Sequence, residues 1–205
     1  MPPLPQHPIL QKSFALIDRE MGDHGFAPQE YALLRRIIHS TADFEFAHLL
    51  HISSNAIEQG ITALQSGSPI VTDVGMVRQG CQSMVNRTFG NSLIAAVDLA
   101  TVAEPGRTRT ETGLLKAWAD HPDAIYIIGN APTALQALCD CIATQTIYPP
   151  LVIGVPVGFV GVLEAKHQLA ALRVPQIRVD SRKGGSSVAA AILNALLVLA
   201  WEAQP

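Results

Sequence analysis

A histidine closes a stretch of two arginines and two isoleucines that runs from Arg35 to His39. Apolar residues recur at helical spacing before it, which predicts a helix over about residues 28–39 with one side turned inward. Arg35 and Arg36 lie one turn before His39, so the three side chains can share a neighbourhood. An imidazole, with an ordinary pKa of about 6.5, serves as acid and base near neutrality. The alternative is a polar residue at the end of a packing helix, where the helix dipole favours a charged histidine. Spacing alone leaves both interpretations open.

The turn Arg182 to Ser187 (Arg-Lys-Gly-Gly-Ser-Ser) combines two cations, two glycines and two hydroxyls before an alanine-rich helical pattern. Backbone N–H groups at a helix start and the helix dipole both favour an anion, so the turn predicts a site for a carboxylate or phosphate. The alternative is an ordinary serine cap after a flexible turn. The turn is not a Walker loop, because the Gly-x-x-x-x-Gly-Lys-Ser/Thr spacing does not occur in the chain.

A second glycine-rich loop, Gly154 to Gly161, has the spacing Gly-x-x-x-Gly-x-x-Gly, which differs from the dinucleotide-binding fingerprint. Its glycines would let a large flat ligand approach the backbone closely. Close packing of a helix on a strand would require glycines there equally well.

Metal binding is not predicted. Cys139-Asp140-Cys141 has the wrong spacing for a zinc or redox motif, and His48 and His51 are not accompanied by a cysteine cluster or a His-Glu-x-x-His pattern. An odd number of cysteines, here three, without a secretory signal indicates reduced structural thiols and a cytoplasmic protein.

The elements that must position these residues alternate along the chain. Short β-branched runs predict parallel strands covered on both faces, at Ile70–Thr72, Leu93–Val97, Ile125–Ile128, Leu151–Val155 and Gln176–Val179. Helical patterns lie near 28–39, 55–66, 108–121, 132–146, 162–172 and 185–201. This alternation predicts an α/β protein with a doubly wound parallel sheet in a three-layer α/β/α sandwich, formed by residues 1–205 as one domain with an extended, proline-rich lead-in over residues 1–10.

Composition excludes several classes of protein. Hydrophobic residues make up 48% of the 205 residues and charged residues 15%, as in a globule with a sizeable core. A net charge of −3 argues against a general nucleic-acid binder. The longest apolar run, Val188 to Trp201, falls short of the roughly 20 residues that cross a bilayer, so no membrane span is expected.

Ligands of such sheets lie beyond the carboxyl ends of the strands. The loops expected there begin at Asp73, Gly129, Gly154 and Asp180, and Pro132 suits the first turn of the helix after Gly129.

Motifs along nearly the whole chain resemble those of the precorrin-8X methylmutase family, with its cobalt-precorrin-8 counterpart, of corrin biosynthesis. In chain order they are Ser13-Phe14, Arg36–His39, Asp73–Met76, Thr108-Arg109 leading into Leu114–Trp118, Ile128–Leu135, Pro156–Gly161 and Arg182–Ser186. Two positions depart from the family pattern: Ala165 stands where serine is frequent, and Asp180-Ser181 where glycine is more usual.

The resemblance implies a flavodoxin-like fold, a homodimer and a cofactor-free isomerase. The reaction would move a methyl group from C-11 to C-12 of precorrin-8X, giving hydrogenobyrinic acid, or cobyrinic acid when cobalt is already in the ring. Cobalt would then belong to the substrate, a tetrapyrrole polycarboxylate, and the product would pass to neighbouring corrin-pathway enzymes.

His39 becomes the expected catalytic residue on this resemblance. The expected substrate-binding residues are Ser13, Arg36, Asp73, Met76, Arg109, Gly129, Asn130, Ala131, Pro132, Thr133, Val157, Gly158, Phe159, Lys166, Arg182, Lys183, Gly184, Gly185 and Ser186. The arginines and Lys183 suit the substrate's carboxylates. A non-catalytic tetrapyrrole carrier is the alternative, and only the enzyme needs His39 to exchange a proton. A flavin- or nucleotide-binding protein is disfavoured, because both phosphate-binding fingerprints are missing.

Overall fold

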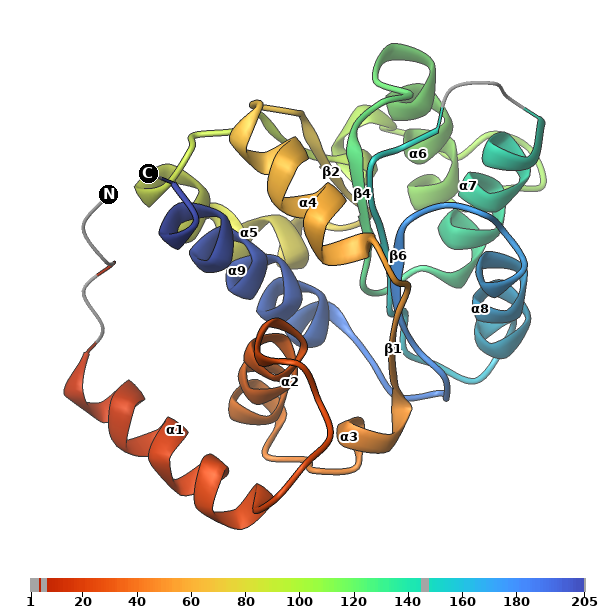
Figure 1. Ribbon diagram of the computed structural model, residues 1–205. Coiled ribbons are helices and arrows are strands. Elements are labelled where there is room, and N and C mark those ends of the chain that lie inside the picture. Colours follow the sequence, from red (N-terminus) through yellow and green to blue (C-terminus); the bar gives the residue numbers. More distant parts are fainter. Residues whose placement is uncertain (1–3, 5–6, 145–147, 205) are drawn as a thin grey trace.

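A central sheet organises the computed structural model, which describes residues 4, 7–144 and 148–204. Within these residues the sheet has six strands in the order β1-β6-β5-β4-β2-β3 (Figure 1). The strands are β1 (Leu50–Ile52), β2 (Ile70–Thr72), β3 (Leu93–Ala95), β4 (Ile125–Ile128), β5 (Val152–Gly154) and β6 (Gln176–Val179). All neighbouring strands pair in parallel except β1, which pairs antiparallel with β6.

Helices cover both faces of the sheet, with a further helix outside one layer (Figure 1). One face carries α2 (Pro28–Thr41), α4 (Ala56–Gln65), α5 (Gly75–Arg87) and α9 (Ser186–Glu202). The other carries α6 (Arg109–Asp120), α7 (Pro132–Thr144) and α8 (Val162–Ala170). Helix α1 (Pro8–Met21) packs on α2, and the short α3 (Phe46–Leu49) leads into β1.

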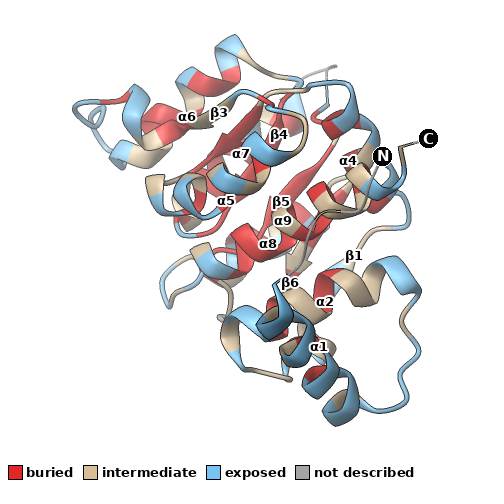
Figure 2. Cartoon of the chain, turned by 90° about the vertical axis from the view of Figure 1, so that its left-hand side faces the viewer, coloured by how far each residue is buried: buried red, intermediate tan, exposed pale blue. Residues whose placement is uncertain are grey.

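Two apolar clusters explain why the strands are hydrophobic without alternating. Successive side chains of a strand point to opposite faces of the sheet. In β4, Ile125 and Ile127 join the cluster under α2, α4, α5 and α9, whereas Tyr126 and Ile128 join the cluster under α6, α7 and α8. Both faces are therefore buried, as the red sheet between the helices in Figure 2 shows.

The predicted doubly wound α/β/α sandwich is confirmed, with three corrections. The antiparallel β1 and the helices α1 and α5 were not predicted. The strand predicted at Leu93–Val97 ends at Ala95 and continues as a 3-10 helix, Ala96–Leu99. The extended lead-in does not reach residue 10, because α1 begins at Pro8, capped by the His7 imidazole, which accepts a hydrogen bond from the N–H of Ile9. Residues 1–3 and 5–6 of that lead-in lie outside the described residues.

The winding of the sheet reverses between β2 and β4. The chain places β3 on one side of β2 and then returns across it to β4, so α5 and α6 lie on opposite faces. The carboxyl ends of β2 and β4 are the topological switch point, where ligands of doubly wound sheets bind. Asp73 and Gly129 follow these two strands directly. No helix in the described part of the chain has the length and apolar character needed to span a bilayer.

Candidate active site

A buried carboxylate joins the two loops at the switch point. Asp73 is 0% exposed, and its Oδ2 accepts hydrogen bonds from the backbone N–H groups of Asn130 (2.6 Å) and Ala131 (2.8 Å). Its Oδ1 accepts from the N–H of Val74 at 2.9 Å. Burial raises the pKa of Asp73, and the N–H donors, Gly129 among them, oppose that rise. The Asp73 side chain thus faces the protein and not the solvent.

The loops after β4, β5 and β6 meet through close backbone contacts at glycines. A Cβ atom on Gly129 would lie 2.8 Å from Val77 Cγ2, and one on Gly184 would lie 2.2 Å from the carbonyl oxygen of Val155. The N–H of Gly185 donates to the same oxygen at 2.8 Å. Protein atoms fill the space that Gly129 and Gly184 leave open, so these two glycines serve close packing between the loops and α9.

The anion turn predicted at residues 182–187 is built around two glycines with positive φ, 146° at Gly184 and 116° at Gly185. Helix α9 then begins at Ser186. The N–H of Gly158 donates to the carbonyl of Arg182 at 3.2 Å, which ties the loop after β5 to this turn. The predicted loops at the carboxyl edge are therefore gathered in one place.

Lys166 binds the backbone of the anion turn. Its side chain is buried on α8, and Nζ donates to the carbonyl oxygens of Ser181 (2.6 Å) and Lys183 (2.8 Å). Burial lowers the pKa of Lys166 to about 8. Its ammonium therefore acts on the protein's own backbone in this structure.

An apolar rim faces solvent at the same edge. Phe159 is 84% exposed, Val160 90% and Met76 74%, and Val157 is also exposed. The Arg182 guanidinium lies 5.7 Å from the centre of the Phe159 ring. Exposed apolar side chains of this size gather on binding surfaces more often than on inert ones.

Polar groups border this rim at the starts of α6 and α7. Arg109 and Asn130 are exposed, and the hydroxyls of Thr108 and Thr133 lie 3.0 Å apart, joining the two helix starts. Pro132 is the first residue of α7, as predicted, behind the buried Ala131.

His39 lies outside this cluster of loops, near the end of α2. Its Nδ1 is 2.9 Å from Ser13 Oγ on α1, and its ring meets the Phe14 ring edge-on with 5.6 Å between centres. The imidazole is exposed beside a hollow of about 270 Å³ between α1 and the end of α2. Because Nδ1 is engaged, Nε2 is the nitrogen that can act on a ligand.

The two arginines before His39 lie beside the same Phe14 ring as the histidine, as the spacing predicts, but each also has surroundings of its own. Arg35 forms an ion pair with Asp18 of α1 at 3.1 Å and lies 4.4 Å from the Phe14 ring centre. Arg36 is half-buried, and it borders a hollow with Arg87 and Val198, in the last turns of α5 and α9. Both helices start at the carboxyl edge, so Arg36 lies toward the opposite end of the sheet. The structure thus does not place Arg36 beside the loops at the carboxyl edge, and its contact with the substrate stays a prediction.

Lys183 is occupied by carboxylates of the chain itself. Its Nζ lies 2.5 Å from Asp43 Oδ2 and also pairs with Glu45. These hydrogen bonds raise the pKa of Lys183 and lower that of Asp43. The pair joins the anion turn to the segment that follows His39, a link the sequence analysis missed. Its only sequence signal is the acidic spacing Asp-x-Glu just after the His39 helix.

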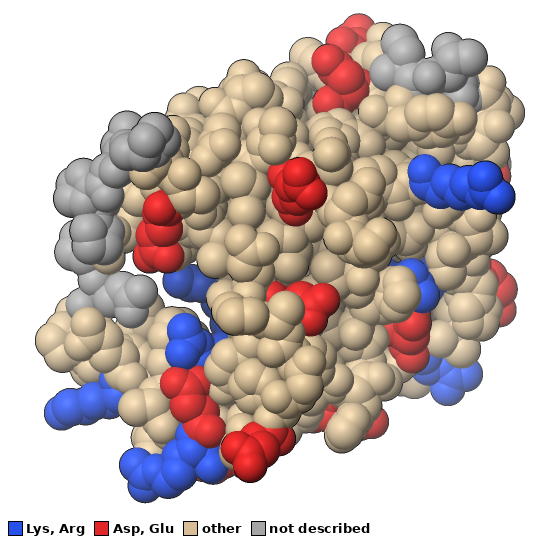
Figure 3. Space-filling view, in the orientation of Figure 1, with Lys and Arg blue, Asp and Glu red and all other residues tan. Residues whose placement is uncertain are grey.

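Basic side chains do not form one separate patch on the face seen in Figure 3, where Lys and Arg are interspersed with Asp and Glu.

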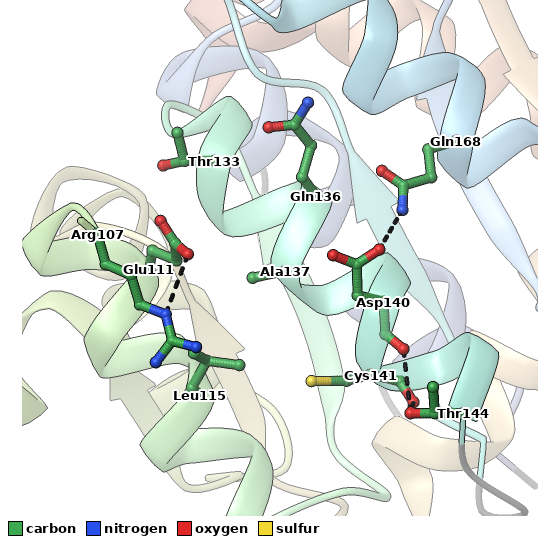
Figure 4. A pocket seen from close by; sticks show the side chains of 10 residues that line it. All are labelled: Arg107, Glu111, Leu115, Thr133, Gln136, Ala137, Asp140, Cys141, Thr144 and Gln168. Atoms are coloured by element: carbon green, nitrogen blue, oxygen red, sulfur yellow. Dashed lines mark hydrogen bonds and ion pairs between the residues drawn. The ribbon is translucent and has the colours of Figure 1, made fainter. Parts of the chain in front are cut away.

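A polar hollow of about 570 Å³ between α6, α7 and α8 was not predicted (Figure 4). Arg107 there pairs with Glu111 at 3.5 Å, and Gln168 donates to Asp140 at 2.5 Å. Its polar groups largely satisfy one another.

The three thiols are free, with Cys81 and Cys139 buried and Cys141 half-buried beside the polar hollow. Among the described residues, no three His, Cys, Asp or Glu side chains gather closely enough to hold a metal ion.

With this geometry in place, similarity to known proteins decides the family. A family model described as precorrin-8X methylmutase matches residues 8–199. The chain belongs to the precorrin-8X methylmutase family. It is therefore an isomerase of cobalamin biosynthesis, as the resemblance predicted.

Individual members of the precorrin-8X methylmutase family match over nearly their whole length. The cobalt-precorrin-8 methylmutase of Synechocystis sp. is 56% identical over 210 residues, covering 96% of this chain and 97% of the relative. The precorrin-8X methylmutase of Pseudomonas aeruginosa is 36% identical, covering 92% and 93%. The crystal structure of a precorrin-8x methyl mutase from Thermus thermophilus is similar with a TM-score of 0.86 and 42% identity, covering 96% and 98%.

Proposed function

We propose that this isomerase moves the C-11 methyl group of cobalt-precorrin-8 to C-12 and that His39 exchanges a proton with the ring during the shift. The observation that carries the role of His39 is its geometry: an exposed imidazole at the end of α2, held through Nδ1 by Ser13. A carrier needs no such group. An acid–base catalyst needs one that is oriented and open to the ligand.

The chemistry at His39 follows from the hydrogen bond at Nδ1. In the protonated imidazole, Nδ1 donates to the Ser13 hydroxyl oxygen and Nε2 presents its proton to a ligand. A methyl group migrating between neighbouring carbons changes the conjugation of the macrocycle, so charge is redistributed in the transition state. A proton lent by Nε2 to the carbon framework of the ring, or to a ring nitrogen when no cobalt occupies it, lowers that barrier. The same imidazole then takes the proton back, so substrate and product keep the same composition.

The carboxyl edge supplies groups suited to the rest of the substrate. The faces of a corrinoid ring are apolar, and Met76, Val157 and Phe159 are exposed apolar side chains. Its rim carries carboxylates, for which Arg109 and Arg182 are the exposed cations at this edge. Asn130, Thr133, Gly158 and Ser186 complete the proposed contact surface. Arg36 and Lys183 take no part in it, because one lies elsewhere and the other is paired.

A second copy of the chain would complete the site. The hollow beside His39 is open and, at about 270 Å³, small for a macrocycle. Exposed apolar side chains of α1, Ile9 and Leu16, flank this region. We therefore propose a two-fold homodimer in the cytoplasm, the commonest arrangement of soluble oligomers. Light scattering at micromolar concentration would report it, and a fully active monomer would contradict it.

Cobalt enters this proposal as part of the substrate. The 56% identical relative is named for the cobalt substrate, whereas the 36% identical one is named for the metal-free substrate. The proposal assigns the protein no metal ion of its own.

Purified protein should be mixed anaerobically with cobalt-precorrin-8 and, in parallel, with precorrin-8X, while the absorption spectrum is followed. We expect the spectrum of the rearranged corrinoid to develop, faster with the cobalt form. After acid quenching, a separable product with the same mass as the substrate would show isomerisation. Binding without reaction would return only the substrate. A spectral shift that disappears on quenching would identify a carrier, and faster conversion of precorrin-8X would assign the metal-free substrate.

A further inference from the structure

The proposed mechanism does not use the buried carboxyl of Asp73 at the switch point. We infer that Asp73 is an internal anion that positions the Gly129–Ala131 loop and closes this spot to the substrate's carboxylates, so that it acts on the reaction without touching the substrate. Its catalytic consequence rests on the proposed function, but its structural claim does not.

The hydrogen bonds of Asp73 are those of an acceptor. The hydrogen bonds to its carboxyl come from backbone N–H groups, among them Val74 to Oδ1, and Asn130 and Ala131 to Oδ2. A protonated acid would need an acceptor for its own hydrogen. The arrangement therefore suits a carboxylate, whose bonds to N–H groups are stronger than those of a neutral acceptor.

The backbone of Asp73 makes the same residue a junction between strands. Its N–H donates to the carbonyl of Ile127 in β4 at 3.0 Å, and its carbonyl accepts from the N–H of Val97, after β3, at 3.1 Å. Main chain and side chain together connect the ends of three neighbouring strands. Movement of Asp73 would therefore move the loop that carries Asn130.

Backbone N–H groups beyond the carboxyl ends of strands are the usual anion-binding donors of doubly wound proteins. Here Asp73 uses the donors of Asn130 and Ala131, and Gly129 packs tightly against Val77 and Ala189. A substrate carboxylate would find these donors occupied and a like charge behind them. It is directed instead toward the exposed side chains of Arg109 and Arg182, which fixes how the ring can sit on the edge.

Hydrogen exchange of the wild-type amides tests the structural claim without any substrate. We expect the amides of Asn130 and Ala131 to exchange as slowly as those within β4, although Asn130 lies in an exposed loop. Adding the corrinoid product should leave this protection in place. Exchange as fast as that of exposed loop amides, or loss of protection on binding, would overturn the inference.

Asp73→Asn tests the positioning role, because the amide keeps the size but turns one acceptor into a donor facing N–H groups. We expect the two amides to exchange at least about 10-fold faster and kcat/KM to fall about 10- to 100-fold. The pH midpoint of turnover should stay at its wild-type value, because Asp73 does not touch the substrate. Asp98→Asn is the control: it removes an exposed carboxylate, paired with Arg78, after the neighbouring strand. It should change neither readout.

Two results would contradict the positioning role. A shifted pH midpoint with unchanged amide exchange would make Asp73 a titrating partner of the reaction itself. Unchanged exchange and turnover would show that the loop does not depend on the carboxylate. If wild-type protein does not convert the corrinoid, the proposed function fails, while the wild-type exchange measurement still judges Asp73. That measurement also stands if Asp73→Asn does not fold.

Discussion

The carboxyl edge of the sheet and the α1–α2 layer that carries His39 are built in opposite ways. At the edge, buried charges hold loops by their backbones: Asp73 binds N–H groups and Lys166 binds carbonyls. In the α1–α2 layer, α1 is largely exposed (Figure 2), and side-chain contacts such as Arg35 to Asp18 join it to α2. The difference teaches that the surface proposed for the ring is set by the chain's own core. The histidine is on α2, whose inner side is buried in the core, and only the neighbouring α1 is lightly anchored.

The edge should be the part that tolerates least change. Alanine at position 184 would have to adopt a φ of 146° and place its Cβ 2.2 Å from the Val155 carbonyl. Backbone strain and overlap together cost about 2–5 kcal/mol. We expect Gly184→Ala to lower the free energy of unfolding by that amount in chemical denaturation. Gly75→Ala is the matched control, with no atom within 4 Å of the new Cβ, and should change it by less than about 1 kcal/mol. Equal effects would show that the turn is not packed as described.

Lys166 should make the stability of the edge depend on alkaline pH. Its pKa is lowered from 10.5 to about 8 in the folded protein. Between these values the unfolded chain binds the proton and the folded protein does not, so the Lys166 contribution to the free energy of unfolding rises with pH. We expect wild-type protein to gain roughly 1–3 kcal/mol across this interval relative to Lys166→Met. Below about pH 8 the difference between the two proteins should be constant. If the free energies of unfolding of wild-type protein and Lys166→Met changed in parallel up to pH 10.5, the burial of the Lys166 ammonium would be contradicted.

The α1–α2 layer should respond more weakly. Arg35→Ala removes an exposed ion pair with Asp18 and a contact over the Phe14 ring. We expect the free energy of unfolding to fall by about 1 kcal/mol, with faster amide exchange confined to α1. Arg78→Ala, which removes only the surface pair with Asp98, should have a smaller effect. Accelerated exchange throughout the sheet in Arg35→Ala would show that the two regions are not separate.

The sequence predicted those parts of the fold that depend on local patterns. The strands β2, β4 and β5 are buried on both faces, so each appears as a short, dense apolar run, whereas β6 alternates polar and apolar residues. The three residues of β1 carry no such pattern, and their partner is far along the chain, with Leu50 opposite Val179. Helix α1 has apolar residues at helical spacing, but the prolines before it indicated an extended segment.

The sequence predicted the site, like the fold, only where local patterns determine it. Glycine-rich loops after parallel strands must meet at one edge, and they do. Side-chain directions depend on distant partners: Asp73 turns inward to a loop 57 residues away, and Lys183 meets Asp43, 140 residues away. Helical spacing placed Arg36 near His39, but it does not tell which neighbouring helix an arginine will pack against.

The central claim is that His39, and not the carboxyl edge alone, drives the methyl shift. His39→Asn tests it most directly, in single-turnover conversion of cobalt-precorrin-8 followed by absorption, with product affinity measured by titration. His48→Asn, at an exposed histidine on α3, is the control. We expect His39→Asn to bind the product normally and to lose turnover by about 10²–10⁴-fold, the usual contribution of a general acid–base group, while the control keeps the wild-type rate. Conversion by His39→Asn at a near wild-type rate would contradict the claim and leave the rearrangement to binding at the edge alone.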